Sequence, residues 1–368
     1  MKKILILTSS LNMGGAERVA VYLANSWSEL GYEVTLMPTF SGGGSGSFYN
    51  VSDMVDLVYL NELIDQKSNY FKRVFALRSF LVRGEFDFVV SFLTNVNIIA
   101  LISSFFLKKP VLICERSDPY VDKLPFFFRL LRFFLYPFSS KVLIQTNELF
   151  KKIESDRFCF YKRKLGVVGN PISSKIEKNS FYECCSSEKK IISMGRLDKD
   201  KQIDHIIEAF HKVDRKGWIL EIYGDGPQKG YLQSLIDKYY LNDCVFLNGA
   251  VIDVDSVYKG ARIFCMASLY EGFPNSLLEA MSLGCAVISY KTPSGPSEML
   301  DYGLSGVLVE MNDIDGLSNA LQNFIDNPNE IENYSRKSYL SVINKYSSSA
   351  VLFKWDAIFD ELNIKKKI

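Results

Sequence analysis

The sequence has few residues that bind metals and no long apolar run. Only two histidines occur, His205 and His211, and none of the seven dispersed cysteines forms a Cys-x-x-Cys pair. This composition argues against a zinc site and favours reduced thiols in the cytoplasm. The apolar run at residues 4–7 is too short for a secretory signal. The longest one, residues 98–107, includes two serines, so we expect no membrane-spanning helix, which needs about 20 residues.

The chain also has almost no net charge, but its charge is unevenly distributed. Its 43 Lys and Arg and 42 Asp and Glu give a formal charge of +1. Residues 71–165 hold seventeen Lys or Arg against eight Asp or Glu, a net charge of +9, so the remainder carries −8. This asymmetry indicates an anionic partner on the N-terminal half.

Short apolar runs alternate with amphipathic stretches along the chain, which is typical of parallel sheets covered on both faces. The predicted strands are 4–7, 34–36, 88–92, 111–114, 142–144, 165–168, 190–194, 220–223, 245–247, 263–266, 286–289 and 306–309. We predict an α/β protein with two facing doubly wound Rossmann-like domains and a cleft between them. These domains are residues 1–171 and 190–345, joined by a polar linker at 172–189. A C-terminal helix at 346–368 is expected to pack back on the first domain.

The strongest motif starts at Glu271 and reads Glu-Gly-Phe-Pro-Asn-Ser-Leu-Leu-Glu-Ala-Met-Ser-Leu-Gly. Pro274 suits the first turn of a helix, because proline lacks the N–H group that has no partner there. The backbone N–H groups near Asn275 and Ser276 would then favour a phosphate at the positive end of the helix. Glu271 and Glu279 could accept hydrogen bonds from sugar hydroxyls. A helix cap with a solvated glutamate is the alternative interpretation.

A second charged segment follows the first strand of the second domain and reads Gly195-Arg196-Leu197-Asp198-Lys199-Asp200-Lys201. Arg196, as a bidentate fork, and Lys201, as a point charge, could hold a diphosphate. A charged surface turn is the alternative. The turns at 223–227 and 247–249 each end a predicted strand and fit the rim of a nucleoside pocket.

Taken together, these segments resemble the family 4 glycosyltransferases, which are retaining enzymes with the GT-B fold. The resemblance rests also on Gly-Gly-Ala-Glu-Arg at 14–18, Gly-Pro-Ser-Glu at 295–298 and Gly-Leu-Ser-Gly at 303–306. It covers nearly the whole chain and is densest from residue 195 to residue 309. It implies an N-terminal acceptor-binding domain and a C-terminal nucleotide-sugar-binding domain.

The resemblance also implies a role for each matching residue. The catalytic candidates are Arg196 and Lys201, which hold the donor diphosphate and stabilise its charge as it leaves, and Glu271, beside the transferred sugar. Glu279 matches the glutamate that binds the ribose. The donor-binding candidates are Gly14, Gly15, Gly195, Gly224, Phe273, Pro274, Asn275, Ser276, Leu277 and Glu279. The family needs no metal or other cofactor, since the cationic pair supplies the electrostatic stabilisation that Mg²⁺ gives elsewhere.

One departure from the family lies in the first domain. Many relatives carry a histidine there close to the reacting carbon, whereas this chain has none before His205. The corresponding segment, residues 114–119, resembles the Ser-Glu-Arg-Asn-type loop of enzymes that act on polyprenyl-diphosphate sugars. Glu115 and Arg116 are therefore the candidates on the acceptor side.

The segment 123–136 is basic and rich in phenylalanine. We predict an interfacial helix that rests on an anionic membrane through Phe126, Phe127, Arg129 and Arg132. A buried helix of the first domain is the alternative.

These observations predict a hexosyltransferase of surface polysaccharide synthesis, such as O-antigen or capsule. It would move a hexose or N-acetylhexosamine from a nucleotide sugar, with a UDP donor favoured, to a polyprenyl-diphosphate-linked saccharide. The enzyme would lie on the inner face of the cell membrane and bind no nucleic acid. The alternatives are a GDP-mannose-dependent mannosyltransferase, a nucleotide-sugar epimerase of the same fold and a non-catalytic binder. A dinucleotide oxidoreductase is disfavoured, because residues 13–16 lack the three-glycine spacing.

Overall fold

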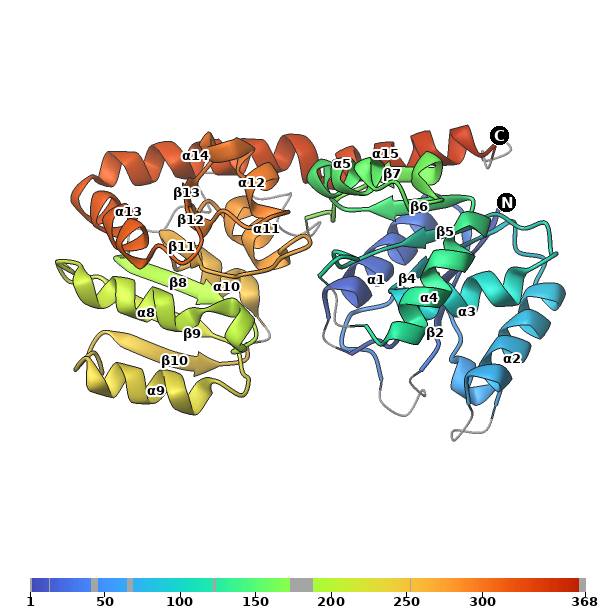
Figure 1. Ribbon diagram of the computed structural model, residues 1–368, viewed down its shortest axis with the longest axis horizontal. Coiled ribbons are helices and arrows are strands. Elements are labelled where there is room, and N and C mark those ends of the chain that lie inside the picture. Colours follow the sequence, from blue (N-terminus) through green and yellow to red (C-terminus); the bar gives the residue numbers. More distant parts are fainter. Residues whose placement is uncertain are drawn as a thin grey trace. The chain divides into compact units, whose positions relative to one another are not determined.

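The chain folds into two compact units in the computed structural model, which describes residues 2–12, 14–40, 46–64, 69–121, 124–172, 188–251 and 253–363. Unit 1 consists of residues 1–169 and 352–368, and unit 2 consists of residues 170–351. Figure 1 shows the elements of both units, coloured along the sequence. The predicted linker falls outside the described residues except at its two ends. The C-terminal segment that belongs to unit 1 begins at residue 352. The sequence analysis expected this segment to begin at residue 346.

Unit 1 is built on a parallel sheet of seven strands in the order β3-β2-β1-β4-β5-β6-β7. The central strand β1 has no exposed surface from Ile4 to Leu7, because helices cover both faces of the sheet. The strands are β1 (Lys3–Thr8), β2 (Glu33–Pro38), β3 (Asp56–Leu57), β4 (Phe88–Phe92), β5 (Val111–Cys114), β6 (Lys141–Ile144) and β7 (Leu165–Val167). The helices are α1 (Gly15–Glu29), α2 (Tyr70–Arg83), α3 (Thr94–Ser104), α4 (Phe126–Leu135) and α5 (Asn147–Ser155).

Unit 2 contains a parallel sheet of six strands in the order β10-β9-β8-β11-β12-β13. The strands are β8 (Lys190–Met194), β9 (Ile219–Tyr223), β10 (Val245–Gly249), β11 (Ile263–Met266), β12 (Ala286–Tyr290) and β13 (Val307–Val309). The helices are α8 (Ile203–Lys212), α9 (Lys229–Lys238), α10 (Val254–Lys259), α11 (Asn275–Ser282), α12 (Pro296–Met299), α13 (Ile314–Asp326) and α14 (Pro328–Tyr346). The predicted α/β class with two doubly wound parallel sheets is confirmed.

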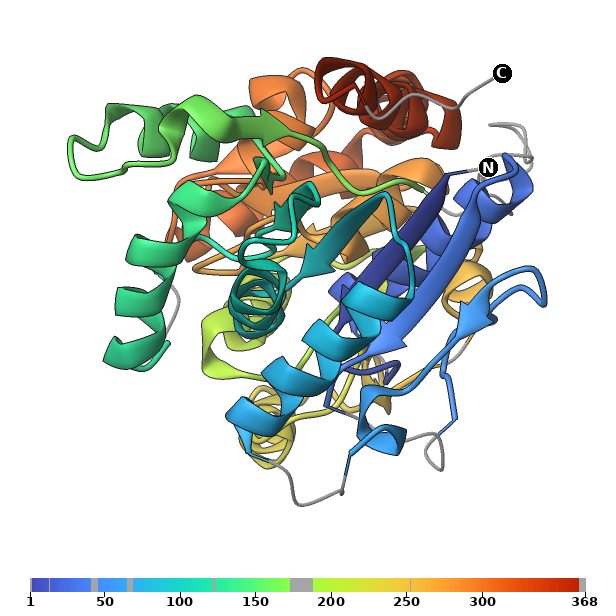
Figure 2. The ribbon, with the colours of Figure 1, turned by 90° about the vertical axis from the view of Figure 1, so that its right-hand side faces the viewer.

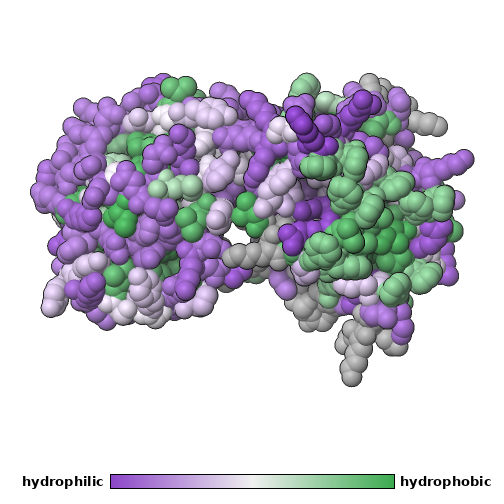
Figure 3. Space-filling model, in the orientation of Figure 1, coloured by the Kyte–Doolittle hydropathy of each residue, from purple (hydrophilic) through white to green (hydrophobic). Residues whose placement is uncertain are grey.

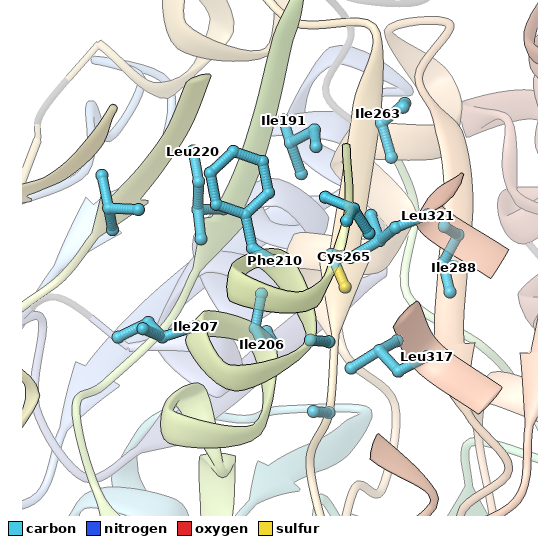
Figure 4. Close-up of a cluster of buried hydrophobic side chains, with 14 of the residues drawn as sticks. Ile191, Ile206, Ile207, Phe210, Leu220, Ile263, Cys265, Ile288, Leu317 and Leu321 are labelled. Atoms are coloured by element: carbon cyan, nitrogen blue, oxygen red, sulfur yellow. The ribbon is translucent and has the colours of Figure 1, made fainter. Parts of the chain in front are cut away.

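The core of unit 2 forms where α8 and α13 cover one face of its sheet. Ile206, Ile207 and Phe210 of α8 are fully buried, and their helical spacing puts them on one face of the helix. Figure 4 shows these side chains together with Ile191, Leu220, Ile263, Cys265 and Ile288 of the strands and Leu317 and Leu321 of α13.

The strand order of each sheet reverses beside the strand that comes first in the chain. β1 lies between β2 and β4, and β8 lies between β9 and β11. Ligands of doubly wound sheets bind at the carboxyl ends of the strands at such a reversal. In unit 2, the loops after β8 and β11 therefore begin side by side where a ligand is expected.

The last helix of the chain, α15 (Ser348–Glu361), completes the core of unit 1. Trp355 and Trp27 of α1 are buried with their ring centroids 5.1 Å apart, and the ring of Phe359 lies 4.9 Å from that of Phe88. Glu361 forms an ion pair of 2.7 Å with Lys141. Distant parts of the sequence therefore share one core.

We predict that Trp355→Ala lowers the free energy of unfolding of unit 1 by about 3–5 kcal/mol, because it leaves a large cavity against Trp27. Denaturant unfolding followed by circular dichroism measures this loss. Phe353→Ala on the same helix is the matched control, since that ring is 74% exposed and its removal should change stability by less than about 0.5 kcal/mol. Equal losses for both variants would contradict the packing described for α15.

Candidate active site

Two charged residues from distant loops meet at the carboxyl edge of the sheet in unit 2. Lys201 ends the turn after β8, and Glu271 lies in the loop after β11. The Lys201 Nζ atom lies 2.5 Å from Glu271 Oε1. The backbone N–H of Leu269 donates to the carbonyl oxygen of Asp200 at 2.8 Å, which fastens the two loops together. The fold thus brings together two of the three catalytic candidates.

The third catalytic candidate, Arg196, points largely into solvent. Its side chain is 78% exposed, and it forms an ion pair of 3.0 Å with Asp198 of its own loop. This ion pair links Arg196 to its own turn, whereas Glu271 pairs with Lys201. Most of the Arg196 side chain is accessible to a ligand that approaches this edge of the sheet.

The start of α11 supplies backbone donors beside this ion pair. Pro274 is the N-cap of the helix and not a residue of its first turn, so the predicted start is shifted by one residue. A proline N-cap has no side-chain oxygen to accept hydrogen bonds from the first N–H groups, which carry the positive end of the helix dipole. Phe273, Leu277 and Glu279 are buried, which leaves the backbone as the part of Phe273 and Leu277 that a ligand can contact.

Two residues that the sequence analysis missed hold this loop in place. Asn170 Nδ2 donates to the side chain of Asn275 at 2.8 Å, and Ser294 Oγ donates to the backbone oxygen of Glu271 at 2.8 Å. Ser294 immediately precedes the Gly-Pro-Ser-Glu motif, which could have drawn attention to it. Asn170 gives no comparable signal in the sequence.

Close backbone contacts explain two glycines of this edge. Gly224 has φ +136°, and a Cβ atom there would lie 1.8 Å from the carbonyl oxygen of Gly195. Gly295 has φ +90°, and its Cβ atom would lie 2.8 Å from the carbonyl oxygen of Gly272. Real Cβ atoms do not come so close to backbone oxygens, so these loops need glycine to pack against one another.

Comparison with known proteins agrees with this geometry. Residues 176–340 match the family Glycosyl transferases group 1. This segment of the C-terminal half of the chain is therefore similar to the glycosyltransferases of that family.

Two relatives match the chain over most of its length. It is 28% identical to an alpha-1,4-N-acetyl-D-galactosaminyltransferase of Campylobacter jejuni that is named for a PP-undecaprenol-linked acceptor, over 89% of this chain and 90% of that protein. It is 25% identical to the amylovoran biosynthesis glycosyltransferase AmsD of Erwinia amylovora, over 98% of this chain and all of that protein.

Solved structures share the fold. A sucrose-phosphate synthase of Thermosynechococcus elongatus superposes with a TM-score of 0.84 at 14% identity, over 99% of this chain and 100% of that one. Anabaena HepE in complex with UDP superposes with a TM-score of 0.80 at 16% identity, over 99% and 100% of the two chains. The expected resemblance to glycosyltransferases and the GT-B fold is thereby confirmed.

The predicted glycine loop lies in unit 1, between β1 and α1. Gly14 is the N-cap of α1, and Gly15 is its first residue. The backbone N–H of Gly14 donates to the Tyr49 hydroxyl at 3.0 Å, and that hydroxyl donates to the carbonyl oxygen of Gly14 at 2.8 Å. Ser9 Oγ donates to Glu17 Oε1 at 2.9 Å beside this turn. Tyr49 is thus a further residue that sequence reasoning missed.

The two acceptor-side candidates have different surroundings. Arg116 is partly buried, and its guanidinium carbon lies 4.7 Å from the centroid of the Phe92 ring. Glu115 is only 2% exposed. Its carboxylate accepts hydrogen bonds from the Thr94 hydroxyl at 3.0 Å and from Asn97 Nδ2 at 3.0 Å. The expectation that Glu115 faces the acceptor is therefore corrected, because its carboxylate is directed into unit 1.

The predicted membrane helix is α4, and its residues divide between two faces. Phe126, Phe127 and Arg129 are exposed, as expected for a membrane surface. Arg132 is 8% exposed, and its guanidinium donates to the carbonyl oxygen of Pro119 at 2.8 Å. The prediction that Arg132 faces the membrane is wrong, because this side chain is needed inside unit 1 to accompany the buried Glu115 carboxylate.

Exposed phenylalanines extend well beyond α4 on this part of unit 1. Ring contacts join Phe133 to Phe160 at 5.1 Å and Phe138 to Phe105 at 5.3 Å. In the view of Figure 2, α2 and α4 lie on the face of unit 1 that is turned toward the viewer, and Figure 3 shows the apolar colouring gathered over α2, α3 and α4. We call these residues, which are 37–86% exposed, the aromatic surface: Phe71, Phe75, Phe105, Phe106, Phe126, Phe127, Phe133, Phe134, Phe138, Phe158 and Phe160. Among the described residues, no helix is long and apolar enough to cross a bilayer.

We predict that Gly224→Ala destabilises unit 2 by about 1–3 kcal/mol or more, since the new methyl group strains the backbone against Gly195. Thermal and denaturant unfolding measure the loss. Gly230→Ala on α9 is the matched control, because a Cβ atom there meets nothing within 4 Å and alanine favours the helix by roughly 0.5–1 kcal/mol. If Gly224→Ala were as stable as Gly230→Ala, the close contact at Gly195 would be refuted.

Proposed function

We propose that this glycosyltransferase moves a hexose or N-acetylhexosamine from a UDP-linked donor to a polyprenyl-diphosphate-linked saccharide in bacterial surface polysaccharide synthesis. The names of two relatives support this: one gives a PP-undecaprenol-linked acceptor and the other amylovoran biosynthesis. HepE, which shares the fold, was crystallised with UDP. The proposal includes retention of configuration at the transferred carbon.

The contact between Lys201 and Glu271 beside the start of α11 carries the proposal. Cleavage of the sugar–phosphate bond leaves additional negative charge on the departing diphosphate. Lys201, the exposed side chain of Arg196 and the first N–H groups of α11 would stabilise that charge. Glu271, already in contact with Lys201, would then lie between the phosphate and the transferred sugar. Glu279, one turn inside α11, would accept hydrogen bonds from the ribose.

Retention requires the new bond to form on the face from which the diphosphate leaves. We propose that a departing phosphate oxygen takes the proton of the acceptor hydroxyl, so that no histidine of unit 1 is needed as a base. The cationic side chains and the helix dipole would supply the electrostatic stabilisation, and we therefore propose that transfer needs no metal ion. Transfer that persists in the presence of a chelator would support this part of the proposal.

Incubation of the protein with radiolabelled UDP-sugars and vesicles containing an undecaprenyl-diphosphate saccharide tests the function directly. Label that moves into lipid supports a transferase. A converted sugar would indicate an epimerase, and binding without turnover a non-catalytic protein. Transfer from GDP-mannose alone would replace the proposed donor by the mannosyl alternative.

We predict that Arg196→Ala and Glu279→Ala each weaken UDP binding by about tenfold or more, because each removes a polar contact to the nucleotide. Glu271→Ala should retain UDP binding and slow transfer by roughly 100-fold, since its contact is made near the reacting carbon. Calorimetric titration with UDP and the radiolabel assay separate the two effects. Lys199→Ala, an exposed lysine of the same turn, is the control and should behave as wild type. Wild-type turnover in all three site variants would refute the assignment.

We also propose that the glycosyltransferase binds the inner face of the cell membrane through the aromatic surface of unit 1. The surrounding region carries the net charge of +9 between residues 71 and 165. Aromatic side chains insert at the boundary of headgroups and acyl chains, while basic side chains near an anionic leaflet contribute about 1 kcal/mol each. This combination fits an anionic bilayer, where a polyprenyl-linked acceptor also resides.

We predict that replacing Phe126, Phe127 and Arg129 together by serine lowers co-sedimentation with phosphatidylglycerol vesicles and leaves the melting temperature within a few degrees. These side chains are exposed, so their loss removes lipid contacts without opening the core.

The matched control replaces three exposed residues of unit 2 by serine, namely Tyr240, Leu304 and Arg336. This variant should sediment like wild type. Undiminished sedimentation of the α4 variant would refute a lipid role for that helix.

A further inference from the structure

Helix α4 joins the aromatic surface to the interior of unit 1. Its outer side carries Phe126 and Phe127, which are among the most exposed phenylalanines of the protein. From its inner side the Arg132 guanidinium reaches the carbonyl oxygen of Pro119 at 2.8 Å and lies 3.9 Å from Glu115 Oε2. Any movement of α4 therefore acts directly on the segment that contains Glu115 and Pro119.

The Glu115 carboxylate is fixed by neutral donors from two neighbouring elements. Thr94 Oγ1 donates to both of its oxygens at 3.0 and 3.1 Å, and Asn97 Nδ2 donates at 3.0 Å, so α3 holds it from one side. The hydroxyl of Tyr136, just beyond α4, donates to it as well. Burial, followed by the adjacent Glu115 charge, raises the pKa of Tyr136 well above its usual value, so this hydroxyl stays a donor. A buried carboxylate also needs positive charge nearby, and Arg132 supplies it.

The loop 115–121 is held at its other end by α5. Lys152 Nζ lies 2.7 Å from Asp118 Oδ2, and the Tyr120 hydroxyl donates to Asp156 at 2.8 Å. Pro119 lies between these two attachments, and its carbonyl oxygen is the one that Arg132 binds. The loop is thus attached to α5 through Asp118 and Tyr120 and to α4 through Pro119.

We propose that Arg132 is a positioning residue that transmits the contact of α4 with lipid to the loop 115–121. This inference rests on the proposed function and on the resemblance described for the segment 114–119, which implies that this loop lies on the acceptor side. The outer side chains of α4 contact the bilayer, and Arg132 and Glu115 set the position of Pro119 from inside the unit. The loop 115–121 would then adopt the conformation needed for transfer only when the enzyme is bound to the membrane that contains its acceptor. Glu115 acts through this contact and does not touch the substrate.

Hydrogen–deuterium exchange with and without vesicles of phosphatidylethanolamine and phosphatidylglycerol tests this coupling without any substrate. In the wild type, vesicles should slow exchange in α4 and also in residues 117–121, the latter by about tenfold. In Arg132→Met, α4 should still be protected, whereas residues 117–121 should not respond. Arg163→Met, an exposed arginine of the same unit, is the control and should behave as wild type.

Steady-state kinetics give a second readout. A purely structural role of Arg132 would not change the KM for the acceptor without also changing the affinity for UDP. Arg132→Met should raise the KM for the undecaprenyl-diphosphate saccharide by about tenfold while UDP affinity stays close to wild type, although the melting temperature falls because the buried Glu115 carboxylate loses a positive partner. Arg132→Lys, which keeps the charge and one donor, should recover part of this loss. Tyr136→Phe removes one donor to Glu115 with little change in volume, and it should produce a smaller effect of the same kind.

The outcomes separate this inference from the proposed function. Vesicle protection of residues 117–121 that persists in Arg132→Met would overturn the coupling, as would a wild-type loop that ignores vesicles although α4 is protected. Vesicles that leave α4 itself unprotected would overturn membrane binding and the coupling with it. Failure of the wild type to transfer any sugar, with the exchange pattern as expected, would overturn only the enzymatic proposal.

Discussion

In unit 2, an ammonium and a carboxylate meet at the point where the strand order of a parallel sheet reverses, and the surrounding loops are built around that contact. Lys201 and Glu271 are both partly shielded from water, so each lowers the cost of leaving the other charged. Ser294 fixes the backbone of Glu271, and the glycine at 295 allows the next loop to approach it. A diphosphate would add a second anion here, which Lys201 can share with Glu271 because a flexible lysine is a point charge without a fixed direction.

Unit 1 solves a different electrostatic problem. It places a carboxylate, Glu115, in its interior and surrounds it with hydroxyl and amide donors from α3 and a tyrosine beyond α4. The guanidinium that accompanies this charge belongs to a helix whose other side is covered with exposed phenylalanine rings. Helix α4 therefore contributes both to the polar interior of unit 1 and to its aromatic surface. This double role is the physical basis for coupling lipid contact at the surface to the position of the loop 115–121.

Much of the fold was predictable because strands of a parallel sheet are buried on both faces and appear as continuous apolar runs. β1, β4 and β11 are such runs and were predicted at their observed positions. β3, a pair of residues at the sheet edge, has no hydrophobic pattern and was missed. Within the site, charge and glycine spacing drew attention to the Glu271 segment and the Arg196 loop, and the resemblance to the family 4 glycosyltransferases implied roles for their residues. Asn170 and Tyr49 gave no signal, because a single polar residue that supports a loop looks like any other polar residue in a sequence. Ser294 was missed as well, although it adjoins the Gly-Pro-Ser-Glu motif.

The sequence by itself determined the class of fold, the two loops that carry the charged site and the amphipathic nature of α4, since each depends on local pattern. Only the tertiary structure decided which sides of that helix are buried. Phenylalanine lies on nearly every side of α4, so hydrophobic periodicity could not distinguish Arg129 from Arg132. The two arginines differ because of their neighbours in the fold. Strand β5 brings Glu115 beside α4, where it pairs with Arg132, whereas Arg129 faces solvent.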